Sequence, residues 1–272
     1  MLKLLLLKSN KIENKIENKI ENKIENKIEN NDIFYVILKN IVNKIPFLYM
    51  KFGDGEYITC NKTFDENDKY KTCTANCDNV LYTPNLKDKL IISFKYFSSL
   101  NNCYFGAWPN TKILEYWNKL ALKEINWIDY HIFILFNKTE LFNKNKYNII
   151  EAIKYSSYQK IYICNKKSII MSKKLLNIDN HIIIDEDNWF EKEYDDILKK
   201  SINIVKNPDN IIFLISGGMG AKVLFYDLHK KFPNATFLDI GSALHYLFTK
   251  ENIRFWNYTH TEILNYYKNL ID

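Results

Sequence analysis

Apolar residues along the chain follow two patterns, helical spacing and short unbroken runs. Apolar positions at i, i+3 and i+4 predict helices, and short apolar runs bounded by polar or turn residues predict buried strands. We expect helices over residues 32–43, 86–100, 112–122, 147–155, 168–176, 190–205 and 221–232. We expect strands over residues 47–52, 103–108, 160–164, 181–184, 211–215 and 235–240.

The order of these elements predicts the fold class. Strands that alternate with helices pair in parallel through right-handed crossovers. The later strands, such as residues 211–215, are unbroken apolar runs, which is typical of a sheet covered on both faces. We therefore predict an α/β fold over residues 32–272, a Rossmann-like and mostly parallel sheet with helices on both faces.

A repetitive segment precedes this predicted domain. Residues 11–30 are five copies of Lys-Ile-Glu-Asn. In a helix this period of four would place like charges at i and i+4, and the isoleucines would drift around the helix axis. We interpret residues 1–31 as a low-complexity tail. A self-associating helical stalk is the alternative.

Composition and charge narrow the classes of function. The chain has 272 residues, of which 47% are hydrophobic and 15% aromatic, so it can form a folded core. The formal net charge is +6, but the lysines are scattered and Arg254 is the single arginine. Proteins that bind nucleic acids usually cluster their arginines, so we expect no nucleic-acid partner.

Two further observations concern the cellular compartment. The apolar run at residues 4–7 is far shorter than the roughly 20 residues of a membrane span, and it is too short for a signal peptide. The five cysteines are an odd number without zinc-site spacing, which predicts reduced thiols. We therefore expect a soluble cytoplasmic protein without a transmembrane segment, of unknown oligomeric state.

Glycine is scarce in this chain. There are seven glycines, whereas average usage would give about 19 for this length. A chain with this bias should keep glycine where a Cβ atom cannot be tolerated, at positive φ or close to a ligand. Three clusters hold Gly53 and Gly55, then Gly217, Gly218 and Gly220, and last Gly241. We therefore expect the functional residues to lie in these three places.

The first cluster contains two carboxylates, Asp54 and Glu56, with Gly53 and Gly55 on either side of Asp54. Where a strand ends in a tight loop, both side chains can turn toward one point. A hard divalent cation such as Mn²⁺ or Mg²⁺ would relieve their repulsion and would bring a phosphate with it. The alternative is an ordinary solvated Asp-Gly turn.

The second cluster links the strand at residues 211–215 to the helix that follows. A glycine-rich link of this kind offers backbone N–H groups and the positive end of the helix dipole to a diphosphate. The P-loop spacing is absent. Of the dinucleotide fingerprint only Gly218 and Gly220 fit, because Val223 stands at the third glycine position. A plain tight turn is the alternative.

The third cluster consists of Asp239, Gly241 and Ser242 at the end of the next predicted strand. In a nucleotide-binding fold, an acidic residue about 20 positions after the glycines commonly meets a ribose hydroxyl. The alternative is an aspartate that caps a helix after Gly241. The three clusters together predict a nucleotide ligand.

A family resemblance adds to this interpretation. The hexapeptide Lys-Phe-Gly-Asp-Gly-Glu at residues 51–56 resembles the Arg-Phe-Gly-Asp-Gly-Glu signature of the GT-D fold glycosyltransferases. Residues 215–244 are similar to that family's glycine turn, its Ala-Lys-Val-Leu-x-Tyr-Asp-Leu helix and its Asp-Ile-Gly strand end. The chain departs from the family pattern at two places. Lys51 replaces arginine and so loses bidentate phosphate geometry, and Gly218-Met219 stands where many members have Pro-Thr.

The resemblance implies a metal-dependent glycosyltransferase that moves a sugar from a nucleoside-diphosphate sugar to a glycan or other hydroxyl acceptor. It implies that Asp54 and Glu56 are catalytic and hold Mn²⁺ or Mg²⁺ against the diphosphate. The residues expected to bind the nucleotide sugar are Lys51, Gly53, Gly55, Gly217, Gly218, Gly220, Lys222, Asp239, Gly241 and Ser242.

Three other functions are alternatives. Residues 238–242 resemble the first motif of S-adenosylmethionine-dependent methyltransferases, although only about 30 residues follow Gly241, which is too few for that fold. A nicotinamide oxidoreductase meets the same objection, because the partial dinucleotide fingerprint comes too late in the chain and its third glycine is missing. The third alternative is a non-catalytic protein that binds sugar nucleotides. Loss of the Asp54 and Glu56 pair would be its signature, and both residues are present.

The acceptor side of the reaction gives weaker signals. The candidates for an acceptor base are Asp129, His131, Asp185, Glu186 and His245. Trp108, Trp117 and Trp127 could stack on acceptor sugars, with burial in the core as the alternative.

Overall fold

The central sheet has seven strands, and all of its strand pairs are parallel. The computed structural model describes residues 33–61, 71–72, 81–134, 144–184 and 189–243. The strands are β1 (Leu48–Lys51), β4 (Cys103–Ala107), β5 (Asn126–Asp129), β6 (Gln159–Cys164), β7 (Asn180–Ile183), β8 (Ile211–Ile215) and β9 (Thr236–Asp239). Their order is β5-β4-β1-β9-β8-β6-β7, and β2 (Lys71–Thr72) pairs separately with β3 (Leu81–Tyr82).

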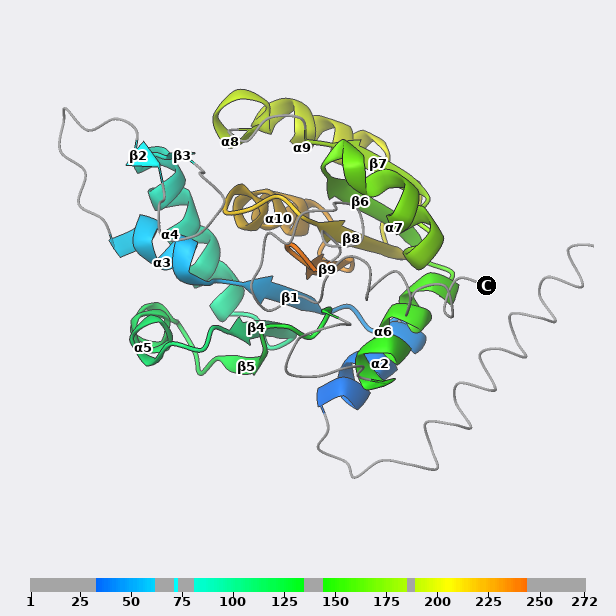
Figure 1. Cartoon of the computed structure of the whole chain (residues 1–272), viewed down its shortest axis with the longest axis horizontal. Helices are drawn as coiled ribbons and strands as arrows, with labels where there is room; N and C mark the ends of the chain where they lie inside the picture. The colour runs from blue at the N-terminus through cyan, green and yellow to red at the C-terminus, as the bar shows by residue number, and fades with distance from the viewer. Residues whose placement is uncertain (1–32, 62–70, 73–80, 135–143, 185–188, 244–272) are drawn as a thin grey trace, which may run out of the picture.

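Helices cover both faces of the sheet (Figure 1). One face carries α3 (Asp54–Asn61), α4 (Pro84–Ser98), α5 (Thr111–Leu120), α8 (Trp189–Lys192), α9 (Tyr194–Asn203) and α10 (Gly220–Lys231). The other carries α2 (Ile33–Val42), α6 (Lys144–Tyr155) and α7 (Ile169–Leu176), which follows the 3-10 turn η1 (Lys166–Ser168). The predicted α/β fold with a parallel sheet and two helical layers is confirmed.

The side chains of β1 show how one strand supplies both cores. Leu48 and Met50 lie in the core under α3, α4, α5 and α10, whereas Phe47, just before the strand, and Tyr49 lie in the core under α2 and α6. Successive side chains of a strand point to opposite faces. Because both faces are covered by helices, the strand is an unbroken apolar run.

The strand order brings the predicted clusters together. β1 lies between β4 and β9, and β9 lies between β1 and β8. The chain leaves β1 toward β4 and β5 on one side, whereas β8 and β9 approach from the other side. The carboxyl ends of β1, β9 and β8 are therefore neighbours at the point where the strand order reverses, which is where open α/β sheets bind ligands.

Three sequence predictions of local structure were wrong. Helix α3 begins at Asp54, where a loop was expected, because Gly53 and Glu56 close a helical first turn. Strand β5 was not predicted, because its outer positions are exposed at the sheet edge and it has no apolar run. The single helix expected over residues 190–205 is two helices, α8 and α9. The chain departs from helical geometry at Glu193, with φ −121° and ψ 0°.

Two features of the structure concern the cysteines and the helices. Cys60, Cys103 and Cys164 are buried free thiols. Within the described ranges, no helix has both the length and the apolar character needed to cross a bilayer. The repeat tail at residues 1–31 lies outside the described residues.

Candidate active site

The first predicted cluster forms the start of helix α3. Gly53 precedes the helix, and its N–H donates a 2.9 Å hydrogen bond to Glu56 Oε2, as in the second half of a capping box. Asp54 Oδ1 accepts a 2.9 Å hydrogen bond from the N–H of Gly55. Residues two apart in a helix point in nearly opposite directions. Accordingly, Asp54 is partly exposed and Glu56 is buried.

Lys222 of α10 joins the three clusters. Its Nζ lies 2.7 Å from Glu56 Oε1 and 2.9 Å from Asp239 Oδ2. It also donates a 3.1 Å hydrogen bond to the Gly218 carbonyl. The exposed fractions of the Lys222, Glu56 and Asp239 side chains are 5%, 8% and 2%. The segments that follow β1, β8 and β9 therefore meet at one buried ammonium group.

The carboxylates keep Lys222 protonated. Burial on its own lowers the pKa of Lys222, but Asp239 and Glu56 outweigh burial and raise this pKa above its ordinary value. Lys222 Nζ contacts Glu56, Asp239 and the Gly218 carbonyl, and its contact with Asp239 Oδ2 is an ion pair without hydrogen-bond geometry. We call Glu56, Lys222 and Asp239 the ion-pair cluster; it carries two negative charges and one positive charge.

Asp239 anchors the turn after β9. Its Oδ2 faces Lys222, and its Oδ1 accepts a 3.2 Å hydrogen bond from the N–H of Gly241, so both carboxylate oxygens contact protein groups. Gly241 has φ +52°, a conformation that favours glycine. Its carbonyl accepts a 2.5 Å hydrogen bond from Ser216 Oγ at the end of β8. Ser242 follows in this turn and is partly buried.

The second predicted cluster is the turn between β8 and α10. Gly218 has φ +61°, and a Cβ atom added there would meet no heavy atom within 4 Å. The Gly217 carbonyl accepts a 2.9 Å hydrogen bond from Trp189 Nε1 of α8. Among the described residues, the N–H groups of Gly218, Met219 and Gly220 have no hydrogen-bond acceptor. Such N–H groups at a helix start can bind a phosphate.

Tyr130 lies directly after β5 at the same end of the sheet and was not among the predicted site residues. Its ring centroid is 4.1 Å from Lys51 Nζ and 4.6 Å from the ring centroid of Trp108. Lys51 itself is buried at the end of β1. An aromatic ring with a lysine above it therefore borders the start of α3. Because β5 was not predicted, nothing in the sequence placed Tyr130 there.

The Tyr130 hydroxyl lies close to the acidic residues of the site. Burial raises the pKa of Tyr130, and Glu56 and Asp239 raise it further, so the hydroxyl stays protonated and can donate a hydrogen bond. A Cβ atom at Gly53 would lie 2.8 Å from this hydroxyl oxygen. Contact with Tyr130 is therefore the physical reason for glycine at position 53.

Replacing Gly53 by alanine should destabilise the protein by about 1–3 kcal/mol, because the added methyl group would press against a tyrosine ring held by Lys51 and Trp108. In the Gly53→Ala/Tyr130→Phe variant, part of this loss should be recovered, because the hydroxyl oxygen is gone. Urea unfolding of the wild type, both single variants and the double variant measures this coupling. Strictly additive losses would contradict the contact.

Two of the candidate acceptor bases are described. Asp129 ends β5; its Oδ2 lies 3.1 Å from Lys146 Nζ, and its Oδ1 accepts a 2.8 Å hydrogen bond from the N–H of His131. Burial lowers the pKa of His131 to about 4; Lys51 and Lys146 lower it as well, and Asp129 opposes them. His131 is therefore neutral at pH 7. Asp185, Glu186 and His245 lie outside the described residues.

The low pKa of His131 predicts a loss of stability in acid. The unfolded chain binds the proton near pH 6.5, whereas the folded chain binds it only near pH 4, so the free energy of unfolding should fall as the pH drops through this interval. Urea unfolding at pH 7 and pH 4.5 measures this fall. His131→Gln should show a smaller fall than the wild type, and an equal fall in both proteins would contradict the assignment.

The three tryptophans have different surroundings. Trp117 is fully buried, and its ring centroid lies 5.0 Å from that of Phe52 and 4.5 Å from that of Phe94, so the core alternative is confirmed for Trp117. Trp108 contacts Tyr130 at the carboxyl end of the sheet. Trp127 lines a pocket at the other end.

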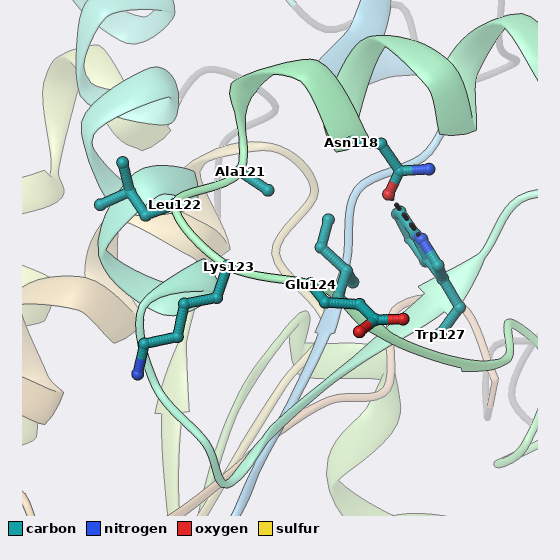
Figure 2. Close-up of a pocket in the computed structure, with 7 residues that line it drawn as sticks. Asn118, Ala121, Leu122, Lys123, Glu124 and Trp127 are labelled. Carbon is teal, nitrogen blue, oxygen red and sulfur yellow. Dashed lines mark hydrogen bonds between the residues drawn. The ribbon is translucent and has the colours of Figure 1, made fainter.

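This pocket has a volume of about 460 Å³ and opens between α5 and the start of β5 (Figure 2). Its lining consists of Asn118, Ala121, Leu122, Lys123, Glu124, Ile125 and Trp127. Trp127 Nε1 donates a 3.0 Å hydrogen bond to Asn118 Oδ1, drawn as the dashed line in Figure 2. None of the residues predicted to bind the metal or the nucleotide sugar lines the pocket, and it lies at the amino end of β5, so we do not assign the nucleotide to it.

Comparisons with known proteins bear on the fold. Comparison with protein-family models and with curated proteins gave no match. Among solved structures, the chain is similar to one described as a new glycosyltransferase (DUF1792) from Streptococcus sanguinis. The TM-score is 0.54, and the sequences are 17% identical over 77% of this chain and 80% of that chain. The chain has this glycosyltransferase fold.

A second solved structure has a similar fold. It is described as the domain of unknown function 1792 with a distinct glycosyltransferase fold, and it matches with a TM-score of 0.53 and 17% identity over 77% of each chain. A selenomethionine-substituted structure of domain 1792 matches with a TM-score of 0.52 and the same identity and coverage. At this identity the likeness concerns the arrangement of strands and helices.

Proposed function

We propose that this protein is a glycosyltransferase that moves a sugar from a nucleoside-diphosphate sugar to a hydroxyl group of a glycan or other acceptor. The observation that carries the proposal is the meeting of the segments after β1, β8 and β9 around Lys222. This meeting point lies where the strand order reverses, the usual place for a nucleotide in such folds. The likeness to structures described as glycosyltransferases supports the proposal.

The diphosphate of the donor is assigned to the first turn of α10. The N–H groups of Gly218, Met219 and Gly220 and the positive end of the α10 dipole are the groups that would bind it. As the bond between the sugar and the diphosphate breaks, negative charge grows on the leaving group. Fixed N–H donors stabilise that charge without rearrangement, which favours the transition state over the bound donor.

A divalent cation fits this site through one protein carboxylate. The described residues contain no group of three or more His, Cys, Asp or Glu side chains that could hold a metal ion. Mg²⁺ bound with a nucleotide often needs only one or two carboxylates, because phosphate and water oxygens complete its shell. Asp54 is partly exposed and suits this role. When bound, Mn²⁺ or Mg²⁺ would neutralise charge on the departing diphosphate.

Glu56 was also expected to bind the metal, but its contacts differ from those of an open metal ligand. Both of its oxygens contact protein groups, Oε1 with Lys222 and Oε2 with the N–H of Gly53. We therefore propose Asp54 as the carboxylate that meets the cation. Lys51, held above Tyr130, is the further positive group proposed near the diphosphate.

Thermal-shift measurements test the proposed function. UDP-, GDP- and CDP-sugars, S-adenosylmethionine and NAD are each added with and without Mn²⁺. We expect the melting temperature to rise only with a sugar nucleotide in the presence of metal, because a ligand that binds the folded state stabilises it. A rise with S-adenosylmethionine would favour the methyltransferase alternative. Binding of a sugar nucleotide without transfer to any hydroxyl acceptor would favour the non-catalytic alternative.

A further inference from the structure

The charged groups of the ion-pair cluster, Glu56, Lys222 and Asp239, contact one another and nearby backbone groups. Lys222 Nζ has three partners, as described above. The remaining carboxylate oxygens accept hydrogen bonds from the N–H groups of Gly53 and Gly241. No charged side chain of the cluster is more than 8% exposed. A ligand would have to displace one of these contacts before it could reach the cluster.

The partners of Lys222 belong to three different segments. Glu56 lies in the first turn of α3, Asp239 ends β9, and Gly218 lies in the turn before α10. Thr59 Oγ1 of α3 adds a 3.0 Å hydrogen bond to Met219 Sδ in the same turn. The start of α3, which carries Asp54, is thereby fixed against the turn that carries the N–H groups proposed to bind the diphosphate.

We propose that Lys222 is a positioning residue. Through Glu56, Asp239 and the Gly218 carbonyl, it holds the glycine turn against the start of α3. Glu56 then binds Lys222, and Asp54 is the carboxylate presented to the cation. The identity of the ligand in this inference rests on the proposed function. The contacts of the cluster do not depend on the proposed function.

The chemistry of the cluster suits positioning better than stabilisation. Removing charged groups from water costs free energy that their mutual attraction often only offsets, and apolar residues of similar size are frequently as stabilising. A buried ion pair does, however, fix the relative orientation of the segments that carry its charges, because the charged groups must meet in a defined geometry. At Lys222 those oxygens fix the relative placement of α3, β9 and the glycine turn.

Metal binding separates the roles of the two acidic residues. Electron paramagnetic resonance of free Mn²⁺ gives the dissociation constant of Mn²⁺ for the wild type, Asp54→Asn and Glu56→Gln. We expect Asp54→Asn to bind Mn²⁺ at least tenfold more weakly and Glu56→Gln to stay within about threefold of the wild type. An equal loss in both variants would overturn the inference. If the wild type binds Mn²⁺ only together with UDP, GDP or CDP, the variants are compared with that nucleotide present. If it binds Mn²⁺ neither alone nor with any of these nucleotides, the metal in the proposed function fails, and the two experiments below decide the role of Lys222.

Nucleotide binding tests the positioning role. The probe is whichever of UDP, GDP and CDP the wild type binds, measured by calorimetry at a temperature where all variants are folded. We expect Lys222→Met to bind the probe at least tenfold more weakly. The matched control is Lys160→Met: Lys160 is equally buried, on β6 at the opposite end of the sheet, and donates a 2.8 Å hydrogen bond to the Ser156 carbonyl. Lys160→Met should bind the probe with an affinity within about twofold of that of the wild type. Equal affinities of Lys160→Met and Lys222→Met for the probe would overturn the inference.

Unfolding measurements test the contact between Glu56 and Lys222 without any ligand. If Lys222→Met does not fold, the Glu56→Gln/Lys222→Met variant, which removes one charge of each sign, replaces it in the calorimetry. In urea unfolding, this double variant should lose less stability than the sum of the two single losses. Additive losses would contradict the contact between Glu56 and Lys222. If the wild type binds none of the three nucleotides, the proposed function fails, and this coupling alone decides whether Lys222 holds Glu56.

Discussion

Asp54→Asn should lower the rate of sugar transfer at least about 100-fold, the scale expected when one group that stabilises transition-state charge is removed. Asp54 is the partly exposed carboxylate at the start of α3, and the amide keeps its size and its acceptor for the N–H of Gly55. The loss should therefore appear in kcat and in the response to Mn²⁺, with the melting temperature nearly unchanged. Steady-state kinetics with the donor found by thermal shift measures it.

The matched control for this variant is Asp195→Asn. Asp195 lies in the first turn of α9 and is exposed, so the same chemical change is made at another helix start. Its transfer rate should equal that of the wild type. Metal-dependent turnover at the wild-type rate in Asp54→Asn would contradict the assignment of Asp54.

Trp117→Ala should destabilise the protein by about 3–5 kcal/mol, the cost of removing a large aromatic side chain from a packed core. Trp117 has no exposed surface, and its ring contacts Phe52 and Phe94. Phe52 directly precedes Gly53, so the cavity would lie beneath the start of α3 and should also weaken donor binding. Urea unfolding gives the stability change.

Trp127→Ala is the control for this second prediction. Trp127 is only partly buried, and it donates its hydrogen bond to Asn118 at the surface. Its loss should be smaller, within about 0.5–3 kcal/mol. Equal losses for the two tryptophans would contradict the assignment of Trp117 to the main core.

Strands with two covered faces were the most predictable part of the fold. The prediction for residues 211–215 has the same bounds as β8, because every residue of this strand is apolar and buried. The parallel order followed from the alternation of such strands with helices. Glycine scarcity was also informative, since Gly218 and Gly241 have positive φ, and Gly53 lies against Tyr130.

Side-chain partners could not be predicted from the sequence. Asp54 and Glu56 are two positions apart, and a loop would let both turn to one cation, but the helix that begins at Asp54 directs them to different places. Lys222 was expected to bind the nucleotide sugar. Its contact with Glu56 depends on β9 lying between β1 and β8, and only the strand order shows that. The roles of these residues toward a ligand stay predictions.

The most direct test of the account is a crystal structure of the protein with its nucleoside diphosphate and Mn²⁺. We predict that the diphosphate accepts hydrogen bonds from the N–H groups of Gly218, Met219 or Gly220, that Mn²⁺ contacts Asp54, and that Glu56 stays with Lys222. A nucleotide bound in the pocket between α5 and β5, or anywhere away from the carboxyl ends of β1, β9 and β8, would contradict the account.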